Sequence, residues 1–257
     1  MALSTGGFAM SVMTAVLLYS MVAVPPTDLP ALLKQIDQKL TSPGDYTAEV
    51  YLEQKQAGKE DLAFQLLVYR RDEDQSLIFL FKKPKTRVGE GFLRKDRNLW
   101  SYNPGVGRWN RQTARTQVAG TDARTRDFDQ WNLAEEYDAE YLTSEKLGAF
   151  TAHKIKLRAK PNMDVAFPIM ELWIDSATNN PLKIGSYALS ERLMQTSYYP
   201  KWVRVESKSG GVYYPEEIRI YDELTKGNET IIKVQKAQIA PLPSNIFTKA
   251  WLESQSR

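Results

Sequence analysis

The hydrophobic positions along the chain change their spacing near residue 45. Before that point they recur at intervals of three and four, which is the spacing of one face of an α-helix. The residues at this spacing are Leu29, Leu32, Leu33, Ile36 and Leu40. Thr27 or Asp28 can cap the N-terminus. The pattern predicts one amphipathic helix that ends near residues 42–44.

From Tyr46 onward the period is two, which is typical of half-buried β-strands. Residues 46–52 and 64–68 alternate in this way, with a turn around Gly58 between them. The run 77–81 (LIFLF) is apolar at every position, which predicts a strand that is buried on both faces. Further strands are predicted at 92–100 (a hairpin that turns at 95–98), 153–159, 171–175, 181–189, 203–207, 212–224 and 230–239.

These segments predict a mainly β fold with a few helices. Roughly eleven to thirteen consecutive strands cannot remain a flat open sheet, because large sheets twist and curl. We therefore expect a single, strongly curved antiparallel sheet that forms an unclosed β-barrel. A second helix, predicted over 127–137 and capped by Asp127, would join the first as a lid or plug of the concave face. No repeat or linker divides residues 26–257, which are expected to form one domain.

The N-terminal segment carries a targeting signal. Residues 8–24 contain no charge over seventeen positions, at the short limit for a membrane helix and near the long limit for a signal sequence. Residues 1–25 are interpreted as an export signal, with cleavage favoured over retention as an anchor. The chain has no cysteine, so disulfides, thiolate metal sites and acylation of an N-terminal Cys are excluded.

The charge pattern gives little support to nucleic acid binding. The formal net charge is +3, so no global field attracts a polyanion. Basic residues gather between Lys82 and Arg126, but they stand at strand ends and turns and do not follow the aromatic residues along one face.

Motifs for catalysis are absent from the sequence. Two Gly-x-Gly pairs, at 89–91 and 105–107, lack the third glycine of a dinucleotide site and are interpreted as turns. His153 is the only histidine, and a lone His cannot build a multi-histidine metal site. Six acids gather at Asp127, Asp129, Glu135, Glu136, Asp138 and Glu140. They could serve a hydrolase, but a solvated helix face is favoured, and we expect no enzyme activity, metal or cofactor.

Aromatic residues suggest a different function. The chain contains 13 Tyr, 9 Phe and 6 Trp, and several of them fall on predicted strands. In an ordinary core such rings pack against each other. On a curved sheet with only two helices as lids, side chains can leave part of the concavity unfilled. A hydrophobic cavity suited to an acyl chain would then result.

Three segments together resemble the LolA-like outer-membrane lipoprotein-sorting proteins. The first, FKKPKTRVGEGFLRKDRNLWSYNPGVGRW at 81–109, has a strand, Lys-Pro, a Gly-containing strand, a hairpin and then Trp-x-Tyr-x-Pro. The others are TRDFDQWNL at 125–133 and PLPSNIFTKAWL at 241–252. With the export signal and the early helix, the resemblance extends from about residue 29 to residue 252.

The resemblance implies a periplasmic carrier in a Gram-negative-type envelope, acting without catalysis as a monomer. It would shelter the acyl chains of lipoproteins or lipids, with an inner-membrane transporter or permease as donor and an outer-membrane acceptor. The expected cavity residues are Leu66, Val68, Phe79, Phe81, Phe92, Trp100, Tyr102 and Trp173. The expected rim residues, for a headgroup or a partner, are Lys83, Arg87, Arg108 and Arg111. Family members often carry Arg where Lys83 stands, so an Arg-dependent latch is not expected. The alternative is an accessory subunit that docks on an envelope transporter or assembly through its basic surface.

Overall fold

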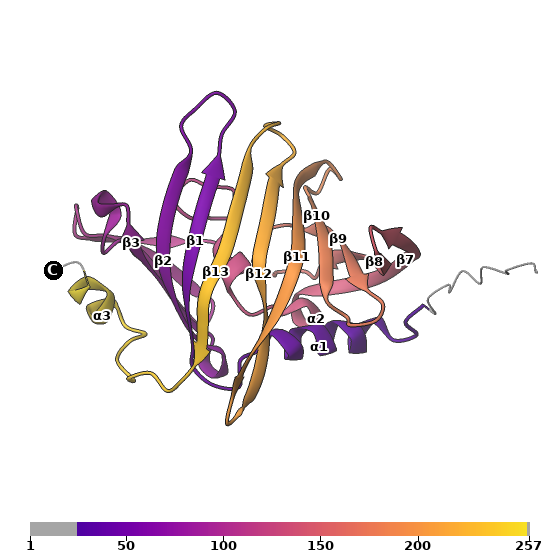
Figure 1. The fold of residues 1–257 in the computed structure, drawn as a ribbon, viewed down its shortest axis with the longest axis horizontal. Helices are drawn as coiled ribbons and strands as arrows, with labels where there is room; N and C mark the ends of the chain where they lie inside the picture. Colours follow the sequence, from indigo (N-terminus) through magenta and orange to yellow (C-terminus); the bar gives the residue numbers. More distant parts are fainter. Residues whose placement is uncertain (1–24, 256–257) are drawn as a thin grey trace, which may run out of the picture.

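All strands of the described residues, 25–255, belong to one antiparallel sheet of thirteen strands in the computed structural model (Figure 1). The sheet is not closed into a barrel, as expected. Its order is β6-β5-β4-β3-β2-β1-β13-β12-β11-β10-β9-β8-β7. The first arm contains β1 (Tyr46–Lys55), β2 (Leu62–Arg71), β3 (Ser76–Lys83), β4 (Gly91–Lys95), β5 (Asn98–Asn103) and β6 (Arg108–Gln112). The second contains β7 (Tyr137–Leu147), β8 (Phe150–Ala159), β9 (Ile169–Asp175), β10 (Pro181–Tyr187), β11 (Leu193–Ser207), β12 (Gly210–Asp222) and β13 (Glu229–Ile239).

The predicted first helix is present as α1 (Leu29–Leu40). Asp28 is its N-cap, because the backbone N–H of Ala31 donates a hydrogen bond of 2.9 Å to Asp28 Oδ1. The helix buries Leu32, Leu33, Ile36 and Leu40 and contacts β12 and β7. Its apolar face therefore forms part of the main core, as its spacing predicted.

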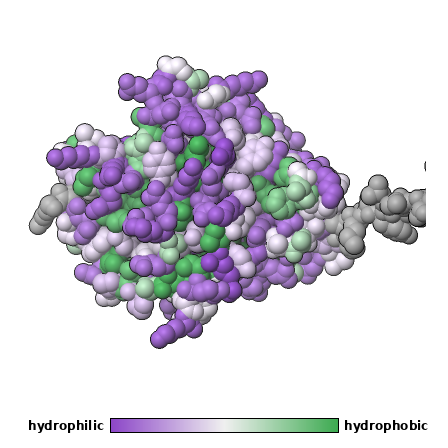
Figure 2. Space-filling model, viewed as in Figure 1, coloured by the Kyte–Doolittle hydropathy of each residue, from purple (hydrophilic) through white to green (hydrophobic). Residues whose placement is uncertain are grey.

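The sheet carries an apolar cluster on each face, and β3 contributes to both. Phe79 and Phe81 belong to the main core on the concave side, whereas Ile78 and Leu80 belong to a second cluster on the outer side. This arrangement confirms that the run 77–81 is buried on both faces. Elsewhere polar and charged residues cover much of the face seen in Figure 1, with apolar residues between them (Figure 2).

The outer cluster is covered by the C-terminal segment. Ile246, Phe247 and Leu252 pack there, the last from α3 (Lys249–Ser254). Asp45 links this segment to the sheet. Its carboxylate accepts hydrogen bonds from Arg71 of β2 and from the backbone N–H of Leu242 in the C-terminal segment.

Residues 113–136, here called the plug, connect β6 to β7 across the concave face. The plug includes two short helices, a 3-10 turn at Thr125–Phe128 and α2 at Leu133–Glu136. The single helix expected over 127–137 is therefore wrong in extent. Asp127 does not cap α2; its Oδ2 accepts a hydrogen bond of 2.7 Å from the backbone N–H of Arg124.

The export segment predicted at residues 1–25 lies almost wholly outside the described residues. Within residues 25–255, no helix is long and apolar enough to span a membrane.

Candidate functional site

A pocket opens on the concave side between α1, the plug and strands β1, β2 and β11 to β13. It encloses about 600 Å³ including space that opens to solvent, but a water molecule's centre can reach only about 50 Å³ of it. Its lining is unusually rich in rings: Tyr46, Phe128, Trp131, Tyr199, Trp202, Tyr213 and Tyr214. Such a volume holds a few water molecules, so an acyl chain does not fit until a side chain or segment moves.

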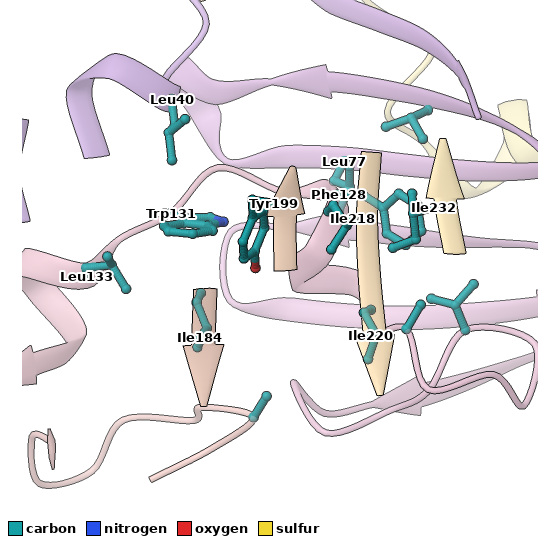
Figure 3. Close-up of a cluster of buried hydrophobic side chains, with 14 of the residues drawn as sticks. Leu40, Leu77, Phe128, Trp131, Leu133, Ile184, Tyr199, Ile218, Ile220 and Ile232 are labelled. Carbon is teal, nitrogen blue, oxygen red and sulfur yellow. The ribbon is translucent and has the colours of Figure 1, made fainter. Parts of the chain in front are cut away.

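The plug contributes apolar side chains to the main core on the concave face (Figure 3). Phe128 packs edge-on against Phe79 with ring centroids 4.8 Å apart. Trp131 packs edge-on against Tyr199 at 5.8 Å. Leu133 of α2 is fully buried in the same cluster. A single segment between two strands thus occupies the place where the sequence led us to expect a ligand.

Five of the eight expected cavity residues lie together on the concave face. They are Leu66, Val68, Phe79, Phe81 and Phe92, all buried in the main core. Of these only Val68 borders the pocket itself. Phe79 and Phe92 contact each other at 6.2 Å, and Phe79 lies under Phe128 of the plug.

Trp100 and Tyr102 lie on the opposite face of the sheet, which corrects the expectation that they line the cavity. Trp100 pairs with Leu93, and Leu93 pairs with Ile78, so alternation places all three in the outer cluster. Lys249 of α3 lies 4.9 Å from the Trp100 ring centroid. These aromatic residues hold the C-terminal helix and do not face the concavity.

Trp173 is also outside the cavity. Its neighbours Leu172 and Ile174 belong to the main core, so Trp173 faces outward between them. There its ring lies 4.6 Å from Lys154 Nζ and 4.4 Å from Lys183 Nζ. We interpret it as an outer-face residue sandwiched by two lysines.

The four expected rim residues are spread over two places. Arg87 stands at the edge of the concavity, where its guanidinium lies 5.2 Å from the Phe81 ring and pairs with Glu90 at 2.8 Å. Lys83 is exposed at the end of β3. Arg108 and Arg111 are exposed on β6, the edge strand of the first arm. The basic residues thus do not form one continuous ring.

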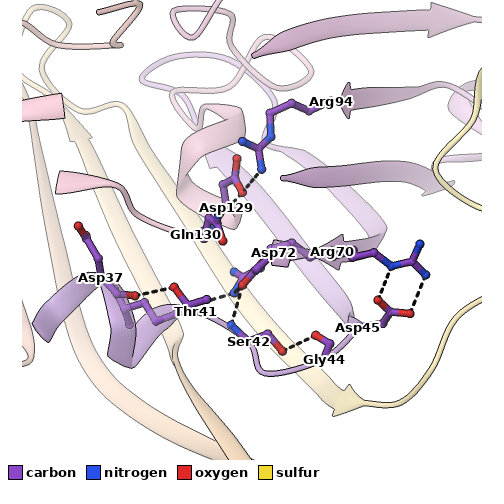
Figure 4. A network of polar contacts seen from close by, with 12 residues as sticks. Asp37, Thr41, Ser42, Gly44, Asp45, Arg70, Asp72, Arg94, Asp129 and Gln130 are labelled. Carbon is purple, nitrogen blue, oxygen red and sulfur yellow. Dashed lines mark hydrogen bonds and ion pairs between the residues drawn. The ribbon is translucent and has the colours of Figure 1, made fainter. Parts of the chain in front are cut away.

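The sequence reasoning missed two arginines that lie on the concave face. Arg70 forms a buried ion pair of 2.7 Å with Asp72, and its Nη2 donates to the carbonyl oxygen of Leu40. Arg94 forms an ion pair of 2.8 Å with Asp129 of the plug. Figure 4 shows this polar network beside α1. Both could have been recognised from their positions. Each Arg lies two residues after an inward-facing apolar residue, Val68 or Phe92, and therefore faces inward as well.

Burial raises the pKa of two acidic side chains in the plug. Desolvation raises the pKa of Asp129, and the charges of Arg94 and Arg70 oppose that rise. Desolvation likewise raises the pKa of Asp127. The expectation of a solvated acidic face is wrong for these two residues. It is confirmed for Glu135, which is exposed on α2. Asp138 and Glu140 are also exposed, but they lie on strand β7 and not on a helix.

Polar contacts fix the plug at two points. Near its middle, the backbone N–H of Asp122 donates to Thr230 Oγ1 at 3.1 Å, and Gln54 Nε2 donates to Asp122 Oδ2 at 2.9 Å. Near its C-terminal end, Asp37 of α1 accepts two bonds of 2.9 Å from the backbone N–H groups of Leu133 and Ala134. Desolvation raises the pKa of Asp37 to about 6, although those bonds lower it. The closed plug therefore depends on a partly desolvated carboxylate.

The single histidine does not line this pocket. His153 is buried on β8, with its Nδ1 2.9 Å from Ser144 Oγ, which fits the structural role expected of it. Among residues 25–255, no group of three or more His, Cys, Asp or Glu side chains is placed to hold a metal ion. The arrangement is one of apolar packing with a few buried ion pairs.

Comparison with known proteins supports the fold. Three solved structures align over most of both chains. A LolA superfamily protein from Nitrosomonas europaea has a TM-score of 0.73 and 20% identity, covering 90% of this chain and 100% of that chain. A domain from Vibrio parahaemolyticus named as an outer membrane lipoprotein-sorting protein has a TM-score of 0.76 and 16% identity, covering 87% and 97%. A DUF1329 family protein from Desulfovibrio piger has a TM-score of 0.77 and 17% identity, also covering 87% and 97%.

Comparison at the sequence level gives one match. A search of curated proteins finds no match to this chain. A family model described as "Uncharacterized protein" matches residues 72–254, a span that contains most of the sheet, the plug and α3. The chain belongs to the family that this model describes, and its fold is that of the LolA-like lipoprotein-sorting proteins.

Proposed function

We propose that the protein is a non-catalytic carrier of the cell envelope, which shelters the acyl chains of lipoproteins or lipids in the concavity of its half-barrel. The observation that carries this proposal is the plug. One segment, with its own polar fastenings, supplies the apolar side chains that fill an otherwise accessible apolar wall. An acyl chain can replace those side chains without disturbing the sheet.

Exchange of the plug's side chains for an acyl chain explains how a carrier could both load and release its cargo. Burying about fifteen methylenes contributes on the order of 12 kcal/mol at ~0.8 kcal/mol each. Displacing Phe128, Trp131 and Leu133 from the core costs roughly 4.5–9 kcal/mol, since each large apolar side chain contributes roughly 1.5–3 kcal/mol when buried. The net gain of roughly 3–7.5 kcal/mol is well below the contribution of the acyl chain alone, so cargo can leave when a partner stabilises the closed plug.

The donor and acceptor belong to the same proposal. A periplasmic carrier would receive its cargo from an inner-membrane transporter or permease and deliver it to an outer-membrane acceptor. The similarity to a lipoprotein-sorting domain supports this envelope setting. The export segment predicted at residues 1–25 is consistent with it.

A disulfide lock tests whether the plug must move. Asp37 Oδ2 accepts a hydrogen bond from the backbone of Ala134, so cysteines at these two positions should be able to form a bond between α1 and α2. The chain has no other cysteine. We expect the oxidised Asp37→Cys/Ala134→Cys protein to take up no fluorescent fatty acid, and the reduced form to take it up.

The reduced protein and the two single-cysteine variants are the controls. Equal uptake by the oxidised and reduced forms would show that the plug does not gate the site. Native mass spectrometry of the purified chain should in addition find bound acyl lipid. A stably captured protein partner, with no lipid in any preparation, would instead favour an accessory subunit that docks through its basic surface.

A further inference from the structure

Arg70 and Arg94 stand at one level of the concave face. Arg70 pairs with Leu77 across β2 and β3, and Leu77 pairs with Arg94 across β3 and β4. The two arginines are therefore separated by two strand spacings, about 10 Å. Above them the same strands present only apolar side chains, Val68, Phe79 and Phe92. The apolar wall thus ends in a pair of guanidinium groups.

Asp129 of the plug binds one of these two arginines, Arg94, and lies near the other, Arg70, which is itself paired with Asp72. The Oδ1 atom of Asp129 accepts from Arg94 Nη2 at 2.8 Å, and the charge of Arg70 also acts on the Asp129 carboxylate. Arg94 Nε, by contrast, is buried with no hydrogen-bond partner among the described residues. A guanidinium binds a carboxylate or phosphate best through two parallel N–H donors, so Asp129 uses only half of what Arg94 offers.

The part of the plug that contacts Arg94 and Arg97 is acidic. Residues 127–136 of the plug contain four acids and no base. Arg94 of β4 pairs with Asp129, and Arg97, exposed in the turn between β4 and β5, pairs with Glu135 at 2.8 Å. If the stretch 127–136 withdraws, both arginines lose their counter-ions. A mostly buried Arg94 left unpaired is costly, and an incoming anion would remove that cost.

Space for such a group exists beside the apolar pocket. A second, polar pocket of about 1100 Å³ including open solvent, of which a water molecule's centre can reach about 210 Å³, is lined by Arg94, Arg97 and Arg126. The two pockets share Asp129 and Trp131. The polar pocket also contains Asp96, Glu135, Glu136 and Asp164. Glu135, Glu136 and Arg126 belong to the plug and leave with it, so Arg94 and Arg97 remain with Asp96 and Asp164.

We propose that the cargo is an anionic amphiphile whose acidic headgroup replaces Asp129 on Arg94, with Arg70 close by, while its acyl tail replaces Phe128 and Trp131. Asp129 is then an internal substitute for the ligand's anion, and it holds the plug closed until a stronger bidentate anion arrives. This inference rests on the proposed carrier function and specifies the class of its cargo.

Two single-chain lipids with the same palmitoyl tail test it: lysophosphatidylglycerol, which is anionic, and lysophosphatidylcholine, which is zwitterionic. Binding to the full chain is measured below the micelle concentration by isothermal titration calorimetry. We expect the anionic lipid to bind about tenfold more tightly or better, the effect of one charge-assisted hydrogen bond. Glycerol phosphate without a tail should neither bind nor compete, which separates a lipid headgroup from free phosphate.

Three variants assign the preference to its residues. Arg94→Gln should abolish the preference for the anionic lipid. Asp129→Asn removes the internal competitor and should tighten anionic binding by about tenfold. Arg158→Gln is the matched control, because Arg158 forms a 2.8 Å ion pair with Glu191 on the surface of the other arm. It should leave both affinities unchanged.

The outcomes separate the two proposals. Equal affinity of the wild-type protein for both lipids, or an Asp129→Asn variant that binds the anionic lipid more weakly, would overturn the headgroup assignment and leave the carrier function standing. Binding of neither lipid would overturn the carrier function itself. If Arg94→Gln fails to fold, the Asp129→Asn result decides the assignment.

Discussion

Replacing Phe128 by Ala should tighten lipid binding while it destabilises the protein. Phe128 is 8% exposed and packs on Phe79 at 4.8 Å. Truncating a buried Phe costs roughly 3–5 kcal/mol, and we take about 2–3 kcal/mol here, because the ring borders the open pocket. The truncation destabilises only the closed state, in which the plug packs on the sheet. The apparent affinity for acyl lipid should therefore rise by about 30- to 150-fold, until the open state dominates.

The assay pairs lipid titration with thermal unfolding, and Phe247→Ala is the matched control. Phe247 is 6% exposed and buried in the outer cluster, so its truncation should lower the unfolding temperature by a similar amount with no change in affinity. Weaker lipid binding by Phe128→Ala would show that this ring is part of the ligand's wall. Parallel changes in the two variants would show that affinity merely follows global stability. Either result refutes the exchange of plug for ligand.

Three further predictions concern stability. Because the pKa of Asp37 is raised to about 6 from 3.8, its charged form destabilises the folded state. Wild-type stability should thus fall by up to ~3 kcal/mol relative to Asp37→Asn as pH rises from about 4 to 6; a pH-independent difference in urea unfolding would contradict this. Thr230→Val removes the buried hydroxyl that accepts from the N–H of Asp122 at 3.1 Å, while that N–H keeps Gln54 Oε1 as a second acceptor at 2.9 Å. The loss should cost about 0.5–1.5 kcal/mol, with faster amide exchange in the plug; unchanged exchange there would argue against a role of Thr230 in holding the plug. Gly91→Ala would place a methyl 2.2 Å from the carbonyl oxygen of Phe79; it should lower the unfolding temperature, with a cost of at least about 1–3 kcal/mol, and an unchanged temperature would refute the clash.

Local patterns in the sequence predicted the sheet well. The alternation in β1 and β2 and the doubly apolar run of β3 each reflect neighbours within a few residues or on the next strand. The same holds for α1, whose cap at Asp28 and apolar face could be seen in the helical spacing. These features are determined by short-range geometry, which a single sequence displays.

The face that each aromatic residue takes was less predictable. Trp100 and Tyr102 read as cavity residues because nothing near them in the sequence reveals a second apolar cluster. That cluster exists only because α3, about 150 residues later in the chain, covers the outer face. A plug at 127–137 was predicted, but its extent over residues 113–136 and the burial of Phe128, Trp131 and Leu133 were not, because that burial comes from non-periodic contacts with distant strands. Arg70 and Arg94 carried a usable signal, a charge at an inward position, but no rule of spacing connects them to Asp129.

The strand order has a consequence for how the chain reaches this structure. Within each arm every strand pairs with its neighbour in sequence, and only β1 with β13 joins the first arm to the last strand. Local hairpins form quickly, whereas a pairing between residues nearly 190 positions apart, such as Glu49 and Lys236, must wait for both arms. We expect this seam to close last during folding. A chain shortened before β13 would keep the first meander and β7 to β12 of the second, but it would expose β1 and β12 as free edges that invite aggregation.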